Sequence, residues 1–145
     1  MKLRLAVTAL ALTAFGFSAF ANETSEMREK LMKQAGGAMG TIGAMAKGEK
    51  PFDQDAVKTA LEAIAETGHK FPDYFGEGTE NLGDEASPAI WENMDDFKAR
   101  SAKLAADAEA QLAQLPADAA GLGAVMGAIG PNCSGCHEKY RLKKQ

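Results

Sequence analysis

The stretch "CSGCHEKYR", close to the end of the chain, contains the residues with the most distinctive chemistry. It holds both cysteines of the sequence, Cys133 and Cys136, and one of its two histidines, His137. Two thiols three residues apart can form a redox-active disulfide, bind a metal ion or attach to a haem. The adjoining imidazole adds a second kind of metal ligand, so the elements around the motif decide between these chemistries.

The three interpretations place different demands on the rest of the chain. A thioredoxin-type pair belongs beside a βαβ unit, and no alternating β pattern is visible. A structural zinc ion needs about four ligands, and the only other histidine, His69, is distant in sequence. C-x-x-C-H is the attachment pattern of c-type haem: the two thiols add to the two vinyl groups on one porphyrin edge, and the imidazole reaches the iron. The pattern therefore favours haem c over a disulfide or zinc.

The first 21 residues are predicted to be a secretory signal peptide. Lys2 and Arg4 precede an uncharged apolar stretch that ends in Ala19-Phe20-Ala21, and the polar "NETSE" follows. A basic head, an apolar middle and a small-x-small exit are typical of a cleaved signal rather than a membrane anchor. The expected mature domain is 22–145, in an export compartment, which in a bacterium is the periplasm.

The mature part is expected to be helical throughout. Apolar residues recur at steps of three and four in a first helix that ends before Gly48 and Pro51. A second helix is predicted to begin at Asp53 as N-cap, with Phe52 and Val57 as a hydrophobic staple. A third is predicted from Ser87-Pro88 to Pro116, and a fourth from about Ala117 to about Lys143 with an interruption at Pro131.

Four amphipathic helices predict an all-α fold, an antiparallel four-helix bundle that can hold a cofactor between facing helices. The core is rich in Ala and Gly, which suggests that something besides side chains fills part of the interior. The net charge of -4 argues against a nucleic-acid partner, and no membrane span is expected after the signal is removed. No Ser/His/Asp set or phosphate-binding loop indicates an enzyme.

At this level of detail the mature chain resembles the cytochromes c′, exported bacterial haem proteins with a C-terminal C-x-x-C-H motif. The resemblance extends over nearly all of residues 22–145. Besides the motif, it is carried in order along the chain by "MREKLM", "AKGEKPFDQDAV", "FPDYFGEGTE" and "SPAIWENMDDF".

The resemblance implies roles for individual residues. Cys133 and Cys136 would form the thioether links to one haem c, and His137 would be the axial iron ligand. Three further residues are implied to line the haem pocket: Arg28 near the propionates, Phe75 as an aromatic wall and Arg141 beside the proximal face. The resemblance also implies redox partner proteins and a homodimer formed through the first two helices.

Met32 separates two functions within this family. In cytochromes c′ this position covers a vacant side of the iron, which is then five-coordinate, high-spin and able to bind NO or CO. In the related low-spin cytochromes c-556, a methionine here ligates the iron and the protein is an electron carrier. The first function is the main expectation from the sequence, and the second, with Met32 as sixth ligand, is the alternative.

Overall fold

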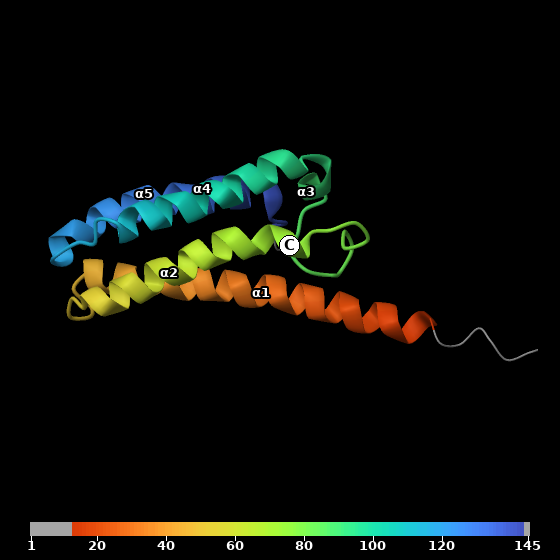
Figure 1. Cartoon of the computed structure of the whole chain (residues 1–145), viewed down its shortest axis with the longest axis horizontal. Helices are drawn as coiled ribbons and strands as arrows, with labels where there is room; N and C mark the ends of the chain where they lie inside the picture. The colour runs from red at the N-terminus through yellow and green to blue at the C-terminus, as the bar shows by residue number, and fades with distance from the viewer. Residues whose placement is uncertain (1–12, 144–145) are drawn as a thin grey trace, which may run out of the picture.

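The computed structural model describes residues 13–143, with side chains described from residue 22 onward. Four long helices form an antiparallel bundle (Figure 1): α1 (Thr13–Ala46), α2 (Gln54–Lys70), α4 (Met94–Leu112) and α5 (Leu122–Tyr140). Three short helices lie in the connections: η1 (Phe71–Tyr74), α3 (Ala89–Glu92) and η2 (Ala119–Gly121). The predicted fold class is confirmed.

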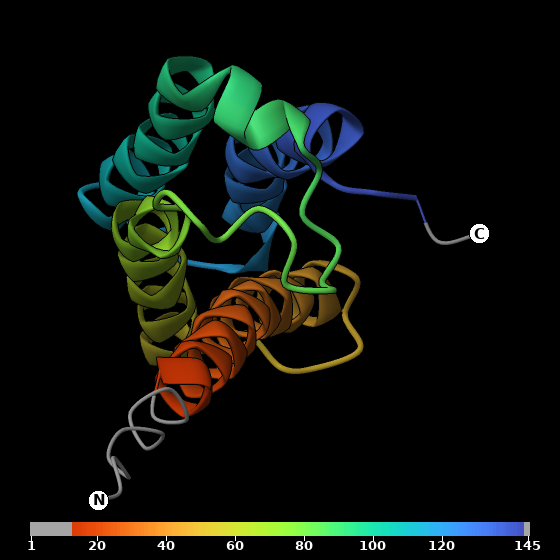
Figure 2. The same cartoon turned by 90° about the vertical axis from the view of Figure 1, so that its right-hand side faces the viewer.

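Each long helix packs against two neighbours, in the cyclic order α1, α2, α4 and α5 (Figure 2). α5 packs less closely against α1 and α4 than α2 does. The helix that carries the C-x-x-C-H motif therefore has the least direct contact with the other long helices. Within the described residues, no helix is long and apolar enough to cross a membrane.

The predicted signal peptide lies largely outside what the structure describes. Residues 1–12 are not described, and residues 13–21 contribute only helical backbone to the start of α1. Cleavage after Ala21 therefore stays a prediction.

Local sequence signals explain where the first two helices end and begin. After α1 the chain turns at Gly48, whose φ of 74° suits a residue without a Cβ atom. The Asp53 carboxylate accepts a hydrogen bond from the Ala56 N–H, as an N-cap should. Phe52 packs against the core just before this cap. These boundaries agree with the sequence prediction.

The later helices differ from the prediction in their ends and at two interior points. α4 ends at Leu112 rather than near Pro116, and α5 spans Leu122–Tyr140 rather than about 117–143. The expected third helix is broken at Asn93 (φ −135°, ψ 46°), which separates α3 from α4. The Asn93 side-chain amide donates to the Ala89 carbonyl, so it competes with the helical backbone bonds at this point. Conversely, α5 continues through Pro131 as one helix. The carbonyl that Pro131 cannot bond belongs to Gly127, which is exposed to water.

The interior consists of two apolar clusters. The larger cluster joins all four long helices and includes Ile42, Leu61 and Ile129. The smaller is aromatic, with Phe75, Phe97 and Tyr140 buried beside Ile90, and the Phe75 and Phe97 ring centroids are 4.8 Å apart. Many contributors to the larger cluster are alanines, which let the helix backbones approach closely.

Among the described residues, the backbones of α2 and α4 come very close together at Gly68. A Cβ atom built on Gly68 would lie 2.7 Å from the Ala105 nitrogen and 2.8 Å from the Ser101 oxygen. We therefore expect Gly68→Ala to lower the free energy of unfolding by about 2 kcal/mol or more, because backbone cannot move aside as a side chain can. Denaturant unfolding followed by circular dichroism measures this.

Gly127→Ala is the matched control, since a Cβ atom there meets nothing within 4 Å. It should leave stability unchanged or raise it by up to about 1 kcal/mol, through the better helix propensity of alanine. Equal destabilisation by both substitutions would contradict the close packing of α2 on α4.

Candidate functional site

The C-x-x-C-H motif occupies the last turns of α5, which ends at Tyr140. Cys133 and Cys136 are free, half-buried thiols. Cys133 packs against the larger apolar cluster and Cys136 against the smaller one, so the pair lies where the two clusters meet. Their spacing puts both thiols on one side of the helix. His137 is exposed and lines an open hollow together with Arg141 and Leu142.

The electrostatic environment keeps these three groups in their neutral forms near pH 7. Burial raises the pKa of the Cys133 and Cys136 thiols, and the nearby Arg100 guanidinium only partly opposes this at Cys136. Burial also lowers the pKa of His137. The positive charge of Arg141 acts in the same direction, and Glu85 opposes both. A neutral imidazole has a free lone pair, which is the form that binds a metal.

The donor set fits a haem better than a bare metal ion. Among the described residues, no group of three or more His, Cys, Asp and Glu side chains is placed to hold a metal. Two thiols one helical turn apart and a neighbouring imidazole match the vinyl edge and the iron of one porphyrin. His69, the other histidine, is remote from this set, since it pairs with Glu109 of α4 at 2.7 Å.

A carboxylate on α4 holds the end of α5 in place. Asp96 accepts hydrogen bonds from the Tyr140 hydroxyl at 2.5 Å, from Arg100 Nε at 2.8 Å and from Lys139 Nζ at 3.0 Å. These donors, Tyr140 first, hold the pKa of Asp96 well below its ordinary value of 3.8. Arg100 also donates to the Gly135 carbonyl, inside the motif, at 3.3 Å. Asp96 thus ties α4 directly to residues just after His137, and through Arg100 to Gly135 just before it.

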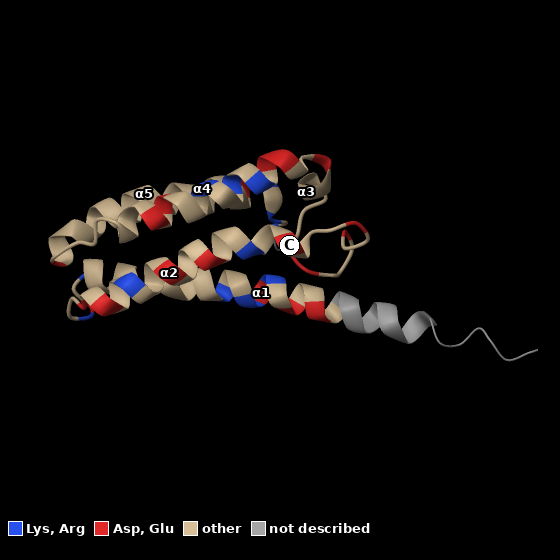
Figure 3. Cartoon of the chain, in the orientation of Figure 1, with Lys and Arg blue, Asp and Glu red and all other residues tan. Residues whose placement is uncertain are grey.

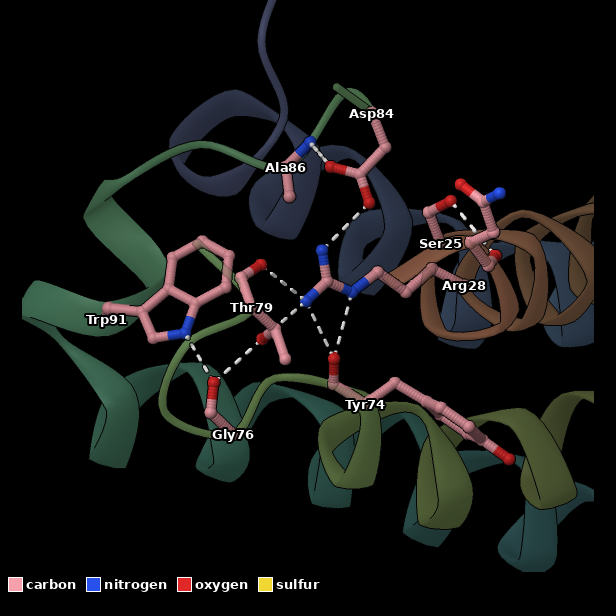
Figure 4. A network of polar contacts seen from close by, with 9 residues as sticks. Ser25, Arg28, Tyr74, Gly76, Thr79, Asp84, Ala86 and Trp91 are labelled. Atoms are coloured by element: carbon pink, nitrogen blue, oxygen red, sulfur yellow. Dashed lines mark hydrogen bonds and ion pairs between the residues drawn. The ribbon is translucent and has the colours of Figure 1, made fainter. Parts of the chain in front are cut away.

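On the neighbouring helix α1, Arg28 is buried at 4% exposure (Figure 4). Its Nε and Nη2 donate to the Tyr74 carbonyl at 2.9 and 2.7 Å. Nη2 also donates to the Thr79 carbonyl and hydroxyl, and Nη1 pairs with Asp84 at 2.8 Å. The guanidinium lies over the Phe75 ring, 4.0 Å from its centroid. Arg28 therefore organises the connection between α2 and α3. Its expected contact with haem propionates stays a prediction.

Met32 lies one helical turn after Arg28 and is half-buried. Met39 and Met126 are among the partly buried residues that pack against the larger cluster. Met32 is not among the residues described as packing against either cluster. A methionine used only to fill the core would be expected in one of these groups.

The structure brings several of the predicted residues together. Phe75 and Cys136 share the smaller aromatic cluster, Arg28 stacks on Phe75, and Arg141 lines the same hollow as His137. The sequence analysis missed Asp84, Glu85 and Asp96, which anchor these residues. Their only signal was the pairing of acidic residues in "GDEAS" and "MDDF", which by itself resembles an ordinary solvated surface.

Comparison with known proteins agrees with this geometry. The family model described as "Cytochrome C'" matches residues 23–141. This chain belongs to the cytochrome c′ family. A cytochrome c-556 of Agrobacterium tumefaciens strain II Chrys is 54% identical over 119 residues, covering 82% of this chain and 97% of that protein. A cytochrome c′ of Rhodopseudomonas palustris is 40% identical over 146 residues, covering 99% of each.

The fold comparison gives the same family. The solved structure of cytochrome c′ from Rhodopseudomonas palustris superimposes with a TM-score of 0.79 at 40% identity, covering 84% of this chain and 98% of that one. Family membership, together with Cys133 and Cys136 in the C-x-x-C-H motif, implies one covalently bound haem c with its iron. Members of this family are non-enzymatic haem proteins, and they are periplasmic.

The Asp96 contacts lead to a prediction about acid stability. Because the pKa of Asp96 is depressed in the folded state, its stabilising effect is present above its unfolded pKa of about 3.8. The effect is lost as the pH falls below that value toward the folded pKa. We expect Asp96→Asn to be less stable than the unsubstituted protein at pH 7, and the difference should shrink progressively below about pH 5.

Thermal unfolding at a series of pH values measures this, with Asp95→Asn as the matched control. Asp95 is the exposed neighbour of Asp96 on the same turn, and its substitution removes the same charge. A stability loss by Asp96→Asn that is independent of pH, or equal to that of the control, would contradict the anchoring role.

Proposed function

We propose that this protein is a periplasmic electron carrier of the c-556 type, with a low-spin haem iron ligated by His137 and Met32. This replaces the five-coordinate, NO- or CO-binding function that the sequence favoured. The observation that carries the proposal is the greater similarity to cytochrome c-556, at 54% identity, than to cytochrome c′, at 40%. Met32 is half-buried and outside both groups of core-packing residues, so the core does not claim its thioether.

The chain contributes attachment, ligation and exclusion of water. Cys133 and Cys136 would form the two thioether links, and the neutral His137 imidazole and the Met32 thioether would hold the iron. When bound, the haem supplies a one-electron ferric/ferrous couple, and a methionine ligand raises its potential. The buried aromatic cluster around Phe75 and Phe97 shields one side of the site from solvent.

The proposal includes export of the protein and docking of redox partner proteins. Residues 1–21 act as the signal peptide, and their removal changes the formal charge from -4 to -6, because 16 basic residues become 14 while all 20 acidic residues remain. Figure 3 shows acidic and basic residues interspersed along the helices. Redox partner proteins would dock near the C-x-x-C-H end of α5, where His137 is exposed.

A homodimer through the first two helices is also part of the proposal. The face between α1 and α2 bears a hollow lined mostly by small side chains, including Ala38, Thr41, Thr59 and Ala63. Gly36, Gly37 and Gly40 leave the neighbouring surface of α1 open, because a Cβ atom there meets nothing within 4 Å. A second α1–α2 pair can approach such a flat surface closely.

The axial ligation is tested by the absorption spectrum of the reduced protein with and without CO. We expect sharp, split visible bands that CO leaves largely unchanged, because Met32 occupies the sixth position. Met32→Ala should convert the spectrum to a broad, unsplit band that shifts with CO. Met39→Ala is the matched control, since Met39 packs against the core and its loss should affect stability alone. An unsubstituted protein with an open, CO-binding iron would overturn the proposed function.

The dimer is tested by sedimentation velocity across a concentration series. Thr59 lines the hollow, and Thr59→Arg places a long cation in it, so we expect the dissociation constant to rise at least about tenfold. Ala102→Arg, at an exposed position of α4, should leave it unchanged. A monomer at all concentrations in the unsubstituted protein would exclude the dimer.

A further inference from the structure

Two consecutive acidic residues connect the two sides of the proposed haem site. Asp84 accepts a hydrogen bond from Arg28 Nη1 of α1 at 2.8 Å. Glu85 accepts from Arg141 Nε at 2.6 Å, and Arg141 Nη2 lies 2.5 Å from the same carboxylate oxygen. We call residues Asp84 to Ser87 the acidic strap. Its carboxylates join α1 to the end of α5, and Ala86 packs against the smaller apolar cluster.

The backbone of the strap is also tied to the end of α5. Ala86 forms an isolated antiparallel bridge with Arg141. The Ser87 N–H donates to the Tyr140 carbonyl at 3.0 Å, and the Leu142 N–H donates to the Glu85 carbonyl at 2.8 Å. A bond from the Ala86 N–H to Asp84 Oδ1 at 3.1 Å holds the turn at the start of the strap. The strap is therefore a short, well-bonded strand partner rather than a loose loop.

Each arginine that the strap holds lies four residues from one of the two proposed iron ligands. Arg28 is four residues before Met32, about one turn along α1. Arg141 is four residues after His137, and its N–H closes the last turn of α5 by donating to the His137 carbonyl at 3.2 Å. Each arginine held by the strap thus belongs to the helical turn next to one ligand. The two carboxylates set how far apart these two turns lie.

The need for such a constraint follows from the packing. Direct contact between α1 and α5 is sparser than between the other neighbouring long helices, so polar contacts at the helix ends help to set the separation of these two helices. A methionine sulfur bonds iron only within a narrow range of separation. A spacing error of a fraction of an ångström would therefore favour the state in which Met32 is not bound.

We propose that the acidic strap is a positioning element that holds α1 and α5 at the separation at which Met32 reaches the iron. It thereby determines the balance between methionine-bound and open haem. The inference rests on the proposed function, because it presupposes ligation by Met32. Asp84 and Glu85 do not touch the reacting atoms and act only through Arg28 and Arg141.

The two ion pairs should contribute unequally. The Arg28 side chain is 4% exposed and that of Asp84 22%, so loss of the Asp84 charge leaves a buried cation without its counterion. The Arg141 and Glu85 side chains are 48% and 39% exposed, where ion pairs are weak. The backbone bonds of the strap persist in either substitution. Asp84→Asn should accordingly shift the ligand balance more than Glu85→Gln.

The test measures CO affinity and the low-spin fraction of the purified haem protein, alongside its unfolding curve. We expect CO affinity to rise about tenfold in Asp84→Asn, corresponding to 1.4 kcal/mol, and by a smaller factor in Glu85→Gln. The low-spin fraction should fall in the same order. Glu29→Gln is the matched control, since it removes the same charge from an exposed α1 pair with Lys33, and it should change neither quantity.

The possible outcomes distinguish failure of the strap inference from failure of the proposed Met32 ligation. Stability loss with unchanged CO affinity and spectrum in both strap variants would overturn the inference, since the strap would then be only structural. A shift in reduction potential without a change in low-spin fraction would also overturn it, because a charge effect alone explains that result. If Asp84→Asn does not fold, Glu85→Gln decides by the same criteria. An unsubstituted protein that binds CO as readily as Met32→Ala overturns the proposed function, which is recognisable without any strap variant.

Discussion

The buried guanidinium of Arg28 is the interaction on which the arrangement of the haem site depends. A charged group removed from water is costly unless its charge and its donors are matched. Arg28 meets this requirement with Asp84, two backbone carbonyls, the Thr79 hydroxyl and the face of Phe75. None of these partners belongs to a long helix. The requirement therefore orders a glycine-rich connection that has little regular structure of its own, and it places an aromatic wall beside the first helix.

The end of α5 depends on a second set of polar contacts. Asp96 ties Tyr140 and Lys139 to α4, and Glu85 ties Arg141 to the preceding connection. His137 lies just before these tethered residues, on a helix that packs loosely elsewhere. Polar anchors rather than apolar packing therefore orient the imidazole. An ion pair fixes direction as well as distance, whereas a core of small side chains tolerates sliding.

The sequence was sufficient for the fold class, the motif and most helix ends, and these rest on short-range physics. Asp53, Gly48 and the apolar period act within a few residues of where they stand. The break at Asn93 could not be read from the period, because the apolar pattern continues on both sides of it. A different reason explains why Asp84, Glu85 and Asp96 could not be predicted as anchors from the sequence. Apart from Arg100, which lies one turn after Asp96, their side-chain partners are 43 to 56 residues away in sequence. In the sequence, a carboxylate with such partners looks the same as one that faces water.

The order of the helices along the chain has a consequence for how the protein assembles. α1, α2 and α4 share contacts in which α5 takes no part. Both cysteines lie on α5, which is the last of the four long helices to be synthesised. The helices that precede α5 therefore have partners of their own before the attachment residues exist.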